Sequence, residues 1–467
     1  MNSLARQVRQ RAASLLDTHG LIVIPLLVVA LVCGAVVGLR AVVTDTRPCP
    51  PNCQRADLAG ADLRGADLRG GNLELAQVSR ADLQGADLGG ANLYFATLQN
   101  ATLQDANLQE ANLRAALLHG ADLRGADLRR ADAGGARLYE AVLTGADLRG
   151  ANLAGVDFRR ADLRGAVIDA TTTISDKWRL VWEVVNEGGA ERRLAGVDLT
   201  GANLRGADLR RADLRGANLR SADLHDADLS GADLRRADLH EARLDDDTRI
   251  DAKWRLVWEV VNQVRTNREL AGADFSDANL YGAYLRWADL RRADLRRANL
   301  READLQGADL QNADLREAML NDATLRLADL RGANLSGADL TAADLTTANL
   351  RATVIDATTI IAPRWRQVAE IATHGGAGRN LAGLTMSWAD LAGIDLSGAD
   401  LSGADLRASI LEGADLSEAN LEGAILLGAN LRGADLRAAN LRGADLRNAD
   451  LFGALLEGAN LDDAKLR

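Results

Sequence analysis

The sequence is poor in the residues that build an ordinary globular core, a disulfide-rich domain or a common active site. Among its 467 residues, aromatic side chains account for 3%, and there are 5 prolines, 5 histidines and 3 cysteines. Three cysteines are too few for a disulfide framework. The sequence also lacks the motifs Gly-x-Ser-x-Gly, Gly-x4-Gly-Lys-(Ser/Thr), His-Glu-x-x-His and Cys-x-x-Cys. We therefore predict no enzyme activity and no catalytic, cofactor-binding or metal-binding residues.

The sequence also has no excess of basic residues over acidic ones. The chain has 66 acidic and 55 basic residues, which gives a formal net charge of −11. A protein that binds a phosphate backbone usually carries a basic patch or stripe, and the sequence has no such stripe. Nucleic acid is therefore not an expected ligand.

A five-residue period dominates the sequence. Its unit is Ala-(Asp/Asn)-Leu-x-x, repeated without a break in residues 434–446. A period of five fits neither the 3.6 residues of a helical turn nor the two-residue alternation of a strand. Each pentad is therefore expected to form one short extended side and a corner, with the Leu and Ala facing inward and the other three residues facing outward. Apolar residues keep this spacing through four blocks, Leu58 to Ile168, Leu194 to Leu244, Leu270 to Ile355 and Leu381 to Leu466.

The pattern resembles the pentapeptide-repeat family over most of the chain. It rests on long runs such as residues 61–68, Ala-Asp-Leu-Arg-Gly-Ala-Asp-Leu. The resemblance implies an all-β solenoid, a right-handed quadrilateral β-helix with four pentads in each coil, whereas the periodicity alone indicates stacking but not handedness. A disordered low-complexity tract is the alternative. The strict leucine spacing argues against disorder, because stacked leucines can form a continuous core.

The residues before the repeats have a different composition. Residues 1–20 form a basic arm, and residues 21–39 contain no charged side chain. A helix over the second segment would be about 28 Å long, close to the ~30 Å hydrocarbon core of a membrane. We expect an N-terminal single-pass transmembrane helix in contact with membrane lipid, with a cleavable signal peptide as the alternative. Arginines lie on both sides, so the orientation is open, with a slight preference for a cytoplasmic N-terminus and an external solenoid.

Residues 40–54 form a spacer rich in proline and cysteine. Cys49 and Cys53 lie four positions apart, a spacing compatible with a small disulfide loop, with two unpaired thiols or with an inward-facing cap of the first coil. Metal binding by two cysteines without histidine partners is not expected. The blocks of pentads then occupy residues 55–168, 194–244, 270–355 and 381–467.

Three inserts that resemble one another separate the blocks, at residues 169–193, 245–269 and 356–380. In the first two inserts, two tryptophans and two valines recur at i, i+3, i+4 and i+7, the spacing of one helical face. A helix of about ten residues is not stable by itself, so its tryptophan face must pack on another surface. We interpret the helices as lids over an end or flank of the β-helix, with a partner-binding helix as the alternative. The lid residues are Trp178, Trp182, Trp254, Trp258 and Trp365.

Four aromatic residues occupy outward positions where arginine, aspartate and glycine are usual, namely Tyr281, Tyr284, Trp287 and Trp388. They are expected either to pack beneath a neighbouring tryptophan helix or to contact a partner, because exposed aromatic patches tend to mark interfaces. The predicted function is a non-enzymatic, membrane-tethered scaffold or protein-binding rod. The protein partner and the oligomeric state are not predicted.

The family resemblance offers a second function. Pentapeptide-repeat proteins include quinolone-resistance factors that resemble duplex DNA and occupy gyrase. This chain departs from that pattern in its predicted membrane segment, its helical inserts and its nearly balanced surface charge. A DNA-mimic regulator of a DNA-binding enzyme such as gyrase is therefore the alternative function.

Overall fold

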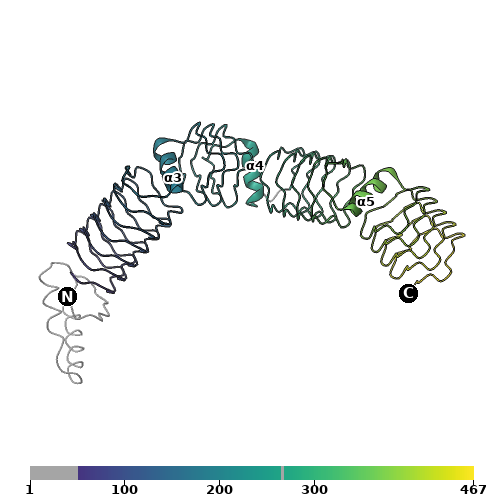
Figure 1. Ribbon diagram of the computed structural model, residues 1–467, viewed down its shortest axis with the longest axis horizontal. Coiled ribbons are helices and arrows are strands. Elements are labelled where there is room, and N and C mark those ends of the chain that lie inside the picture. The colour runs from purple at the N-terminus through teal and green to yellow at the C-terminus, as the bar shows by residue number, and fades with distance from the viewer. Residues whose placement is uncertain (1–50, 264–267, 467) are drawn as a thin grey trace, which may run out of the picture. The chain divides into compact units, whose positions relative to one another are not determined.

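The structure is a computed structural model that describes residues 51–263 and 268–466. Within these residues the backbone winds in four-sided coils that stack on one another (Figure 1). Parallel β-bridges join residues one coil apart, as in the series Asp62, Asp82 and Thr102. This spacing of 20 residues corresponds to four pentads per coil, so the coil length implied by the resemblance is confirmed.

The apolar residues of each pentad form the core. In the pentad at residues 81–85, Ala81 and Leu83 are buried, Asp82 is half-buried, and the last two residues are exposed. The same pattern repeats through the blocks, so the prediction that Leu and Ala face inward is confirmed. Removing these stacked side chains from water is the main favourable contribution to folding of such a coil.

Hydrogen bonds explain why the pentad has this composition. The amide of the central leucine donates to the next coil, as from Leu83 N to Thr102 O at 2.7 Å. The preceding Asp or Asn accepts the amide of the first turn residue, as Asp82 Oδ1 accepts Gln84 N at 3.2 Å. The second turn residue has a positive φ, 63° at Gly85. Asp and Asn therefore stabilise the corner, and glycine suits its last position.

Three α-helices interrupt the coils, namely α3 (Asp176–Glu187), α4 (Ala252–Val261) and α5 (Pro363–His374) (Figure 1). α5 has proline at its first position, where the missing amide hydrogen is not needed. It ends before Gly375, which has a φ of 77°. The side of α4 that contains Trp254 and Val257 is buried, as expected for a short helix that is stabilised by packing.

The chain divides into two compact units, and the boundary lies between Arg179 and Leu180, inside α3. The first unit contains the first block of pentads. The second unit contains the other three blocks together with α4 and α5.

Within the second unit, the coils on the two sides of each helix are joined at one corner. Arg236 N donates to Asp277 O across α4, and Thr347 N donates to Trp388 O across α5, each at 2.8 Å. α4 and α5 are therefore excursions from a β-helix that resumes on the far side of each helix.

The predicted membrane location is corrected by the structure. None of the helices within the described residues combines the length and the apolar character needed to cross a membrane. The longest of them, α3 and α5, have 12 residues each, whereas a membrane span needs about 20. The proposed transmembrane segment, residues 21–39, lies outside the described residues. A membrane tether and a contact with lipid are therefore not part of the function proposed below.

The spacer cysteine that the structure describes is oxidised. Cys53 is buried and disulfide-bonded. Among the alternatives that the sequence left open, the unpaired thiol is therefore wrong for Cys53. Cys49 lies outside the described residues.

Candidate functional site

The tryptophans of the inserted helices face the protein interior to different extents. Trp178, Trp254 and Trp365, the first tryptophan of each helix, are only 3% to 7% exposed. Trp182 and Trp258 are half-buried. The Trp258 indole Nε1 donates to the Ala242 carbonyl at 2.7 Å. These placements support a structural role for the tryptophan faces.

A second recurring element joins each helix to the coil before it, and it was not predicted from the sequence. An Asp-x-x-Thr turn follows each of the first three blocks, and its buried threonine bonds to a leucine carbonyl, as Thr248 Oγ1 does to Leu224 O at 2.9 Å. Arg255 of α4 then donates to the Thr248 carbonyl at 2.6 Å. The sequence signal is Asp-x-x-Thr followed seven residues later by Arg. The same contacts recur for Thr172 with Arg179 and for Thr359 with Arg366.

All four outward aromatics singled out in the sequence are exposed in the second unit. The exposed fractions are 38% for Tyr281, 43% for Tyr284, 58% for Trp287 and 49% for Trp388. Tyr281 is the first turn residue of one corner, Tyr284 lies on the side that follows it, and Trp287 lies on the next corner along the chain. The Arg268 guanidinium lies 5.1 Å from the ring centre of Tyr284. The structure thus groups three of the aromatics near the start of the third block.

Trp388 is distant from that group in sequence but lies on the same corner of the β-helix as Trp287, several coils further along. We call such a line of stacked corners a corner column. Backbone bonds from coil to coil place Gly307, Leu327 and Thr347 between them, and the bond from Thr347 N to Trp388 O continues the column past α5. The Trp287 indole lies over Gly307, because a Cβ added there would come within 2.1 Å of indole Cε3. Leu327 is 48% exposed. We call these five residues the corner ridge.

Leu327 was not among the predicted partner residues. The sequence signal that identifies it is the 20-residue coil length, since Leu327 follows Gly307 and precedes Thr347 by one coil each. The jump from Thr347 to Trp388 has no such regular spacing. It depends on how the chain returns after α5, which only the structure shows.

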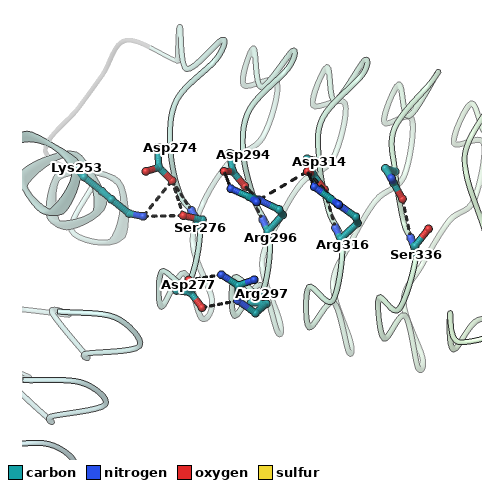
Figure 2. A network of polar contacts seen from close by, with 11 residues as sticks. Lys253, Asp274, Ser276, Asp277, Asp294, Arg296, Arg297, Asp314, Arg316 and Ser336 are labelled. Carbon is teal, nitrogen blue, oxygen red and sulfur yellow. Dashed lines mark hydrogen bonds and ion pairs between the residues drawn. The ribbon is translucent and has the colours of Figure 1, made fainter. Parts of the chain in front are cut away.

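Many charged side chains away from the ridge are paired, either within one pentad or with the next coil. Arg296 contacts Asp294 at 2.5 Å and reaches Asp314 of the next coil at 3.7 Å (Figure 2). Its neighbour Arg316 in turn hydrogen-bonds to Asp314 and lowers the pKa of that carboxyl. The acids of this ladder are therefore compensated by arginine.

Figure 2 also shows how α4 is tied to this ladder of ion pairs. Lys253 Nζ lies 3.0 Å from Asp274 Oδ1 and 2.8 Å from Ser276 Oγ. Burial raises the pKa of Asp274, but hydrogen bonds from Ser276 and Lys253 outweigh this and leave the pKa below its ordinary value. The lysine therefore binds an ionised carboxylate at neutral pH.

A cleft of about 690 Å³ lies beside the C-terminal turn of α5. Its lining includes Arg331, Arg351, His374 and Asp390. Asp390 is half-buried and accepts the amide of Ala392 at 3.1 Å. Burial raises the pKa of Asp390, and the neighbouring carboxylate of Asp329 adds to this effect. The cleft is thus polar and of mixed charge.

One acidic cluster lies near the end of the second block. Carboxylate oxygens of Asp226, Asp245 and Asp247 lie within 4.8 Å of one another. Asp245 already accepts a hydrogen bond from Thr248 Oγ1 at 2.7 Å in the turn before α4. Its position is thus accounted for by the turn, and we assign no metal to the cluster.

Comparisons with known proteins identify the family but not the individual function. A family model described as pentapeptide repeats (8 copies) matches through overlapping segments between residues 52 and 169, 193 and 246, 266 and 346, and 385 and 467. No curated protein matches the sequence significantly.

Several solved structures are similar to parts of the chain. Rfr23, a pentapeptide repeat protein from the cyanobacterium Cyanothece 51142, is 40% identical over 20% of this chain and 64% of its own, with a TM-score of 0.20. HetL, from the cyanobacterium Nostoc sp. strain PCC 7120 and involved in heterocyst differentiation regulation, is 24% identical over 84% of this chain and 88% of its own, with a TM-score of 0.15. QnrB1, a plasmid-mediated fluoroquinolone resistance protein, is 18% identical over 59% of this chain and 91% of its own, with a TM-score of 0.15.

These TM-scores are too low to support an argument about function. The family assignment rests on the family model, whose matched segments cover well over half of the chain, and on the 20-residue coils. The chain belongs to the pentapeptide-repeat family, and its coils form the right-handed β-helix of that family.

Proposed function

We propose that this protein is a non-enzymatic scaffold that binds a protein partner through the corner ridge and the adjacent tyrosines. The observation that carries the proposal is the alignment of Trp287, Leu327 and Trp388 on one corner, with about half of each side chain exposed. Contiguous apolar patches on soluble proteins often mark interaction sites. Tryptophan and tyrosine are also enriched among the residues that dominate binding energy.

The paired charges favour this function over mimicry of DNA. A DNA mimic needs an acidic surface that is not neutralised by its own side chains. Here arginines contact successive acids of the ladder, as Arg296 contacts both Asp294 and Asp314. Regulation of a DNA-binding enzyme such as gyrase therefore has less support than protein binding through apolar contacts.

Site-specific photo-crosslinking tests the proposal. A photoreactive phenylalanine analogue in place of Tyr284 should give discrete protein adducts in an extract of the source cells. The same analogue in place of Tyr94, which is 36% exposed in the first unit, is the matched control and should give none of these adducts.

The adducts should also depend on the ridge. Trp287→Ala together with Trp388→Ala should weaken them strongly, because truncation of a central aromatic commonly costs 2 kcal/mol or more of binding energy, roughly 30-fold in affinity. Equal crosslinking from positions 284 and 94, or adducts unaffected by the double substitution, would show that the ridge is not the binding surface.

A further inference from the structure

A hollow of about 580 Å³ on the first block of pentads differs from the rest of the surface in its charges. Leu117, Arg137 and Asp157 line it from consecutive coils of one side of the β-helix, joined by parallel β-bridges. All of its lining residues belong to the first unit. The corner ridge belongs to the second unit, so this inference does not depend on the proposed scaffold function.

The usual row of acids is interrupted on this side of the β-helix. The position before the central leucine is most often Asp or Asn, but Thr97, Leu117 and Arg137 occupy it in three successive coils. Arg137 is the only basic residue at this position in residues 55–168. Its guanidinium therefore replaces one carboxylate of the row, and an apolar side chain replaces the carboxylate before it.

The acids beside the hollow are already bound by other arginines. Arg159 donates two hydrogen bonds to Asp157, at 2.9 and 2.8 Å, and Arg160 contacts Glu140 at 3.2 Å. The hydrogen bond from Arg159 lowers the pKa of Asp157 most, and the charge of Arg137 adds a smaller effect. Within the part of the chain that the structure describes, the Arg137 side chain has no hydrogen bond or ion pair of its own. The hollow thus has one uncompensated positive charge.

Two stacked rings also line the hollow. The ring centres of His119 and Tyr139 are 4.8 Å apart with an angle of 19° between the planes. Arg160 Nη1 donates to the Tyr139 hydroxyl at 2.8 Å and holds the ring in place. Because His119 and the Arg159 guanidinium, 5.8 Å from the ring centre, approach the faces of Tyr139, its edge borders the hollow. A ring edge carries the positive part of the aromatic quadrupole, so it favours an anion as Arg137 does.

We propose that the hollow binds an oxyanion, the carboxylate or phosphate group of a small organic molecule, with Arg137 as its main partner. A guanidinium presents paired donors in one plane that fit either group. The Gln99 side chain adds a neutral amide donor, and Leu117 offers an apolar contact to the body of the ligand. The volume lies within the range of about 300–1,000 Å³ that is usual for small-molecule sites.

Restoring an acid to the interrupted row should close the site. Leu117→Asp places a carboxylate on the coil next to Arg137, whereas Leu117→Asn places a neutral amide there. Asp and Asn occupy this position in most pentads, so both variants should fold. Isothermal titration calorimetry of the full chain with acetate and with inorganic phosphate measures binding. Leu117→Asp should bind at least about 10-fold more weakly than Leu117→Asn, which should resemble the wild type.

Removing the guanidinium should have a similar effect. Arg137→Gln should weaken binding of the same probes at least about 10-fold. Arg149→Gln is the matched control, because Arg149 lies in the same block but is bound by Asp147 of its own pentad. This control should bind as the wild type does. Thermal midpoints of the variants, measured beside the titrations, verify that each one is folded.

The two probes distinguish the sources of the anionic group. Tighter binding of acetate assigns a carboxylate ligand, and tighter binding of phosphate assigns a phosphate ester. Three results would overturn the site: no binding of either probe to the wild type at millimolar concentration, equal binding by Leu117→Asp and Leu117→Asn, or an equal loss in Arg137→Gln and Arg149→Gln.

Discussion

The junctions at α4 and α5 share a backbone plan but differ in the side chains that fill it. Both helices follow an Asp-x-x-Thr turn, bury their first tryptophan and leave one 2.8 Å corner bond between the flanking coils. At α4 the junction is filled, since Trp258 bonds to Ala242 and His240 Nε2 contacts the Tyr281 carbonyl at 2.8 Å. At α5 the equivalent positions of Trp258 and Tyr281 are the alanines Ala369 and Ala392. Ala392 lines the cleft beside α5, and Ala369 is buried.

The corner residue is also held more firmly at the α4 junction than at the α5 junction. Asp277 at the α4 corner is held by two hydrogen bonds from Arg297, at 2.8 and 2.7 Å. The equivalent corner residue at α5 is Trp388, which is 49% exposed. The turn threonine, the helix arginine and the buried tryptophan are shared by the two junctions and accompany the same backbone path. The side chains that differ make the α4 corner ionic and the α5 corner apolar and exposed. The exposed corner at α5 thus forms one end of the corner ridge.

The largest effect is expected from removing the buried tryptophan that both junctions share. Trp254→Ala and Trp365→Ala should each cost about 3–5 kcal/mol, as for other large core truncations. Each repeat of a solenoid contacts only its neighbours, so the loss should be local. Hydrogen exchange should show lost protection in the coils beside α4 for Trp254→Ala and beside α5 for Trp365→Ala. Unchanged protection in both variants would contradict the structural role of these side chains.

A smaller effect is expected when the α4 junction is made to resemble the α5 junction. Trp258→Ala removes a half-buried ring and leaves the Ala242 carbonyl without its indole donor, at a cost of about 1–3 kcal/mol. Trp258→Phe keeps most of the ring and should cost less. Chemical denaturation of the two variants measures the difference. Equal stability of Trp258→Ala and wild type would show that filling the junction is unimportant.

Two glycines on the corner column of the ridge test whether the Trp287 indole stacks on the next coil. Gly307 and Gly428 have φ values of 67° and 70°, but a Cβ at Gly307 meets the Trp287 indole whereas one at Gly428 meets nothing within 4 Å. Alanine at either position carries the same backbone cost of about 1 kcal/mol. Gly307→Ala should in addition displace the indole, measured as a change in tryptophan fluorescence that Gly428→Ala lacks. Identical spectra would contradict the stacking of Trp287 on the next coil.

The smallest effects on stability are expected from single carboxylates, Asp213 and Asp390, whose pKa values are shifted in opposite directions. A hydrogen bond from Arg215 lowers the pKa of Asp213 from 3.8 to about 2. Its contribution to stability is therefore present above about pH 4 and is lost as the pH falls toward 2. Thermal midpoints should fall in this window, and the fall should be less steep for Asp213→Asn. A midpoint independent of pH between 4 and 2 would contradict the pairing.

Asp390 at the α5 cleft should behave in the opposite way. Burial raises the pKa of this carboxyl, so the folded state holds its proton more tightly than the unfolded state, and the group destabilises the fold as the pH rises through that pKa. Asp390→Asn should therefore raise the thermal midpoint slightly at pH 7. A lower midpoint at pH 7 would show that the ionised carboxylate has a stabilising partner.

The sequence predicted the coil well because each pentad is a local unit. Inward Leu and Ala follow from the period of five, and the coil of four pentads follows from the family resemblance. The turn contacts of Thr248 and Arg255 were not predicted, because they join residues that become neighbours only after a block ends. Trp287 and Trp388 were predicted to be outward aromatics, and both are exposed, whereas Leu327 was not singled out. The alignment of Trp388 with Trp287 depends on the return of the chain after α5, which no local pattern encodes.

Tryptophan accessibility tests the central claim, that the helix tryptophans are structural and the corner tryptophans form an exposed surface. The chain has 7 tryptophans, of which Trp287 and Trp388 are the most exposed among the described residues. Acrylamide quenching and thermal melting should be compared between wild type and the variant with Trp287→Phe and Trp388→Phe. We predict that the variant loses the most readily quenched fluorescence and keeps its thermal midpoint. Readily quenched fluorescence that persists in the variant, or a midpoint that falls by several degrees, would contradict the account.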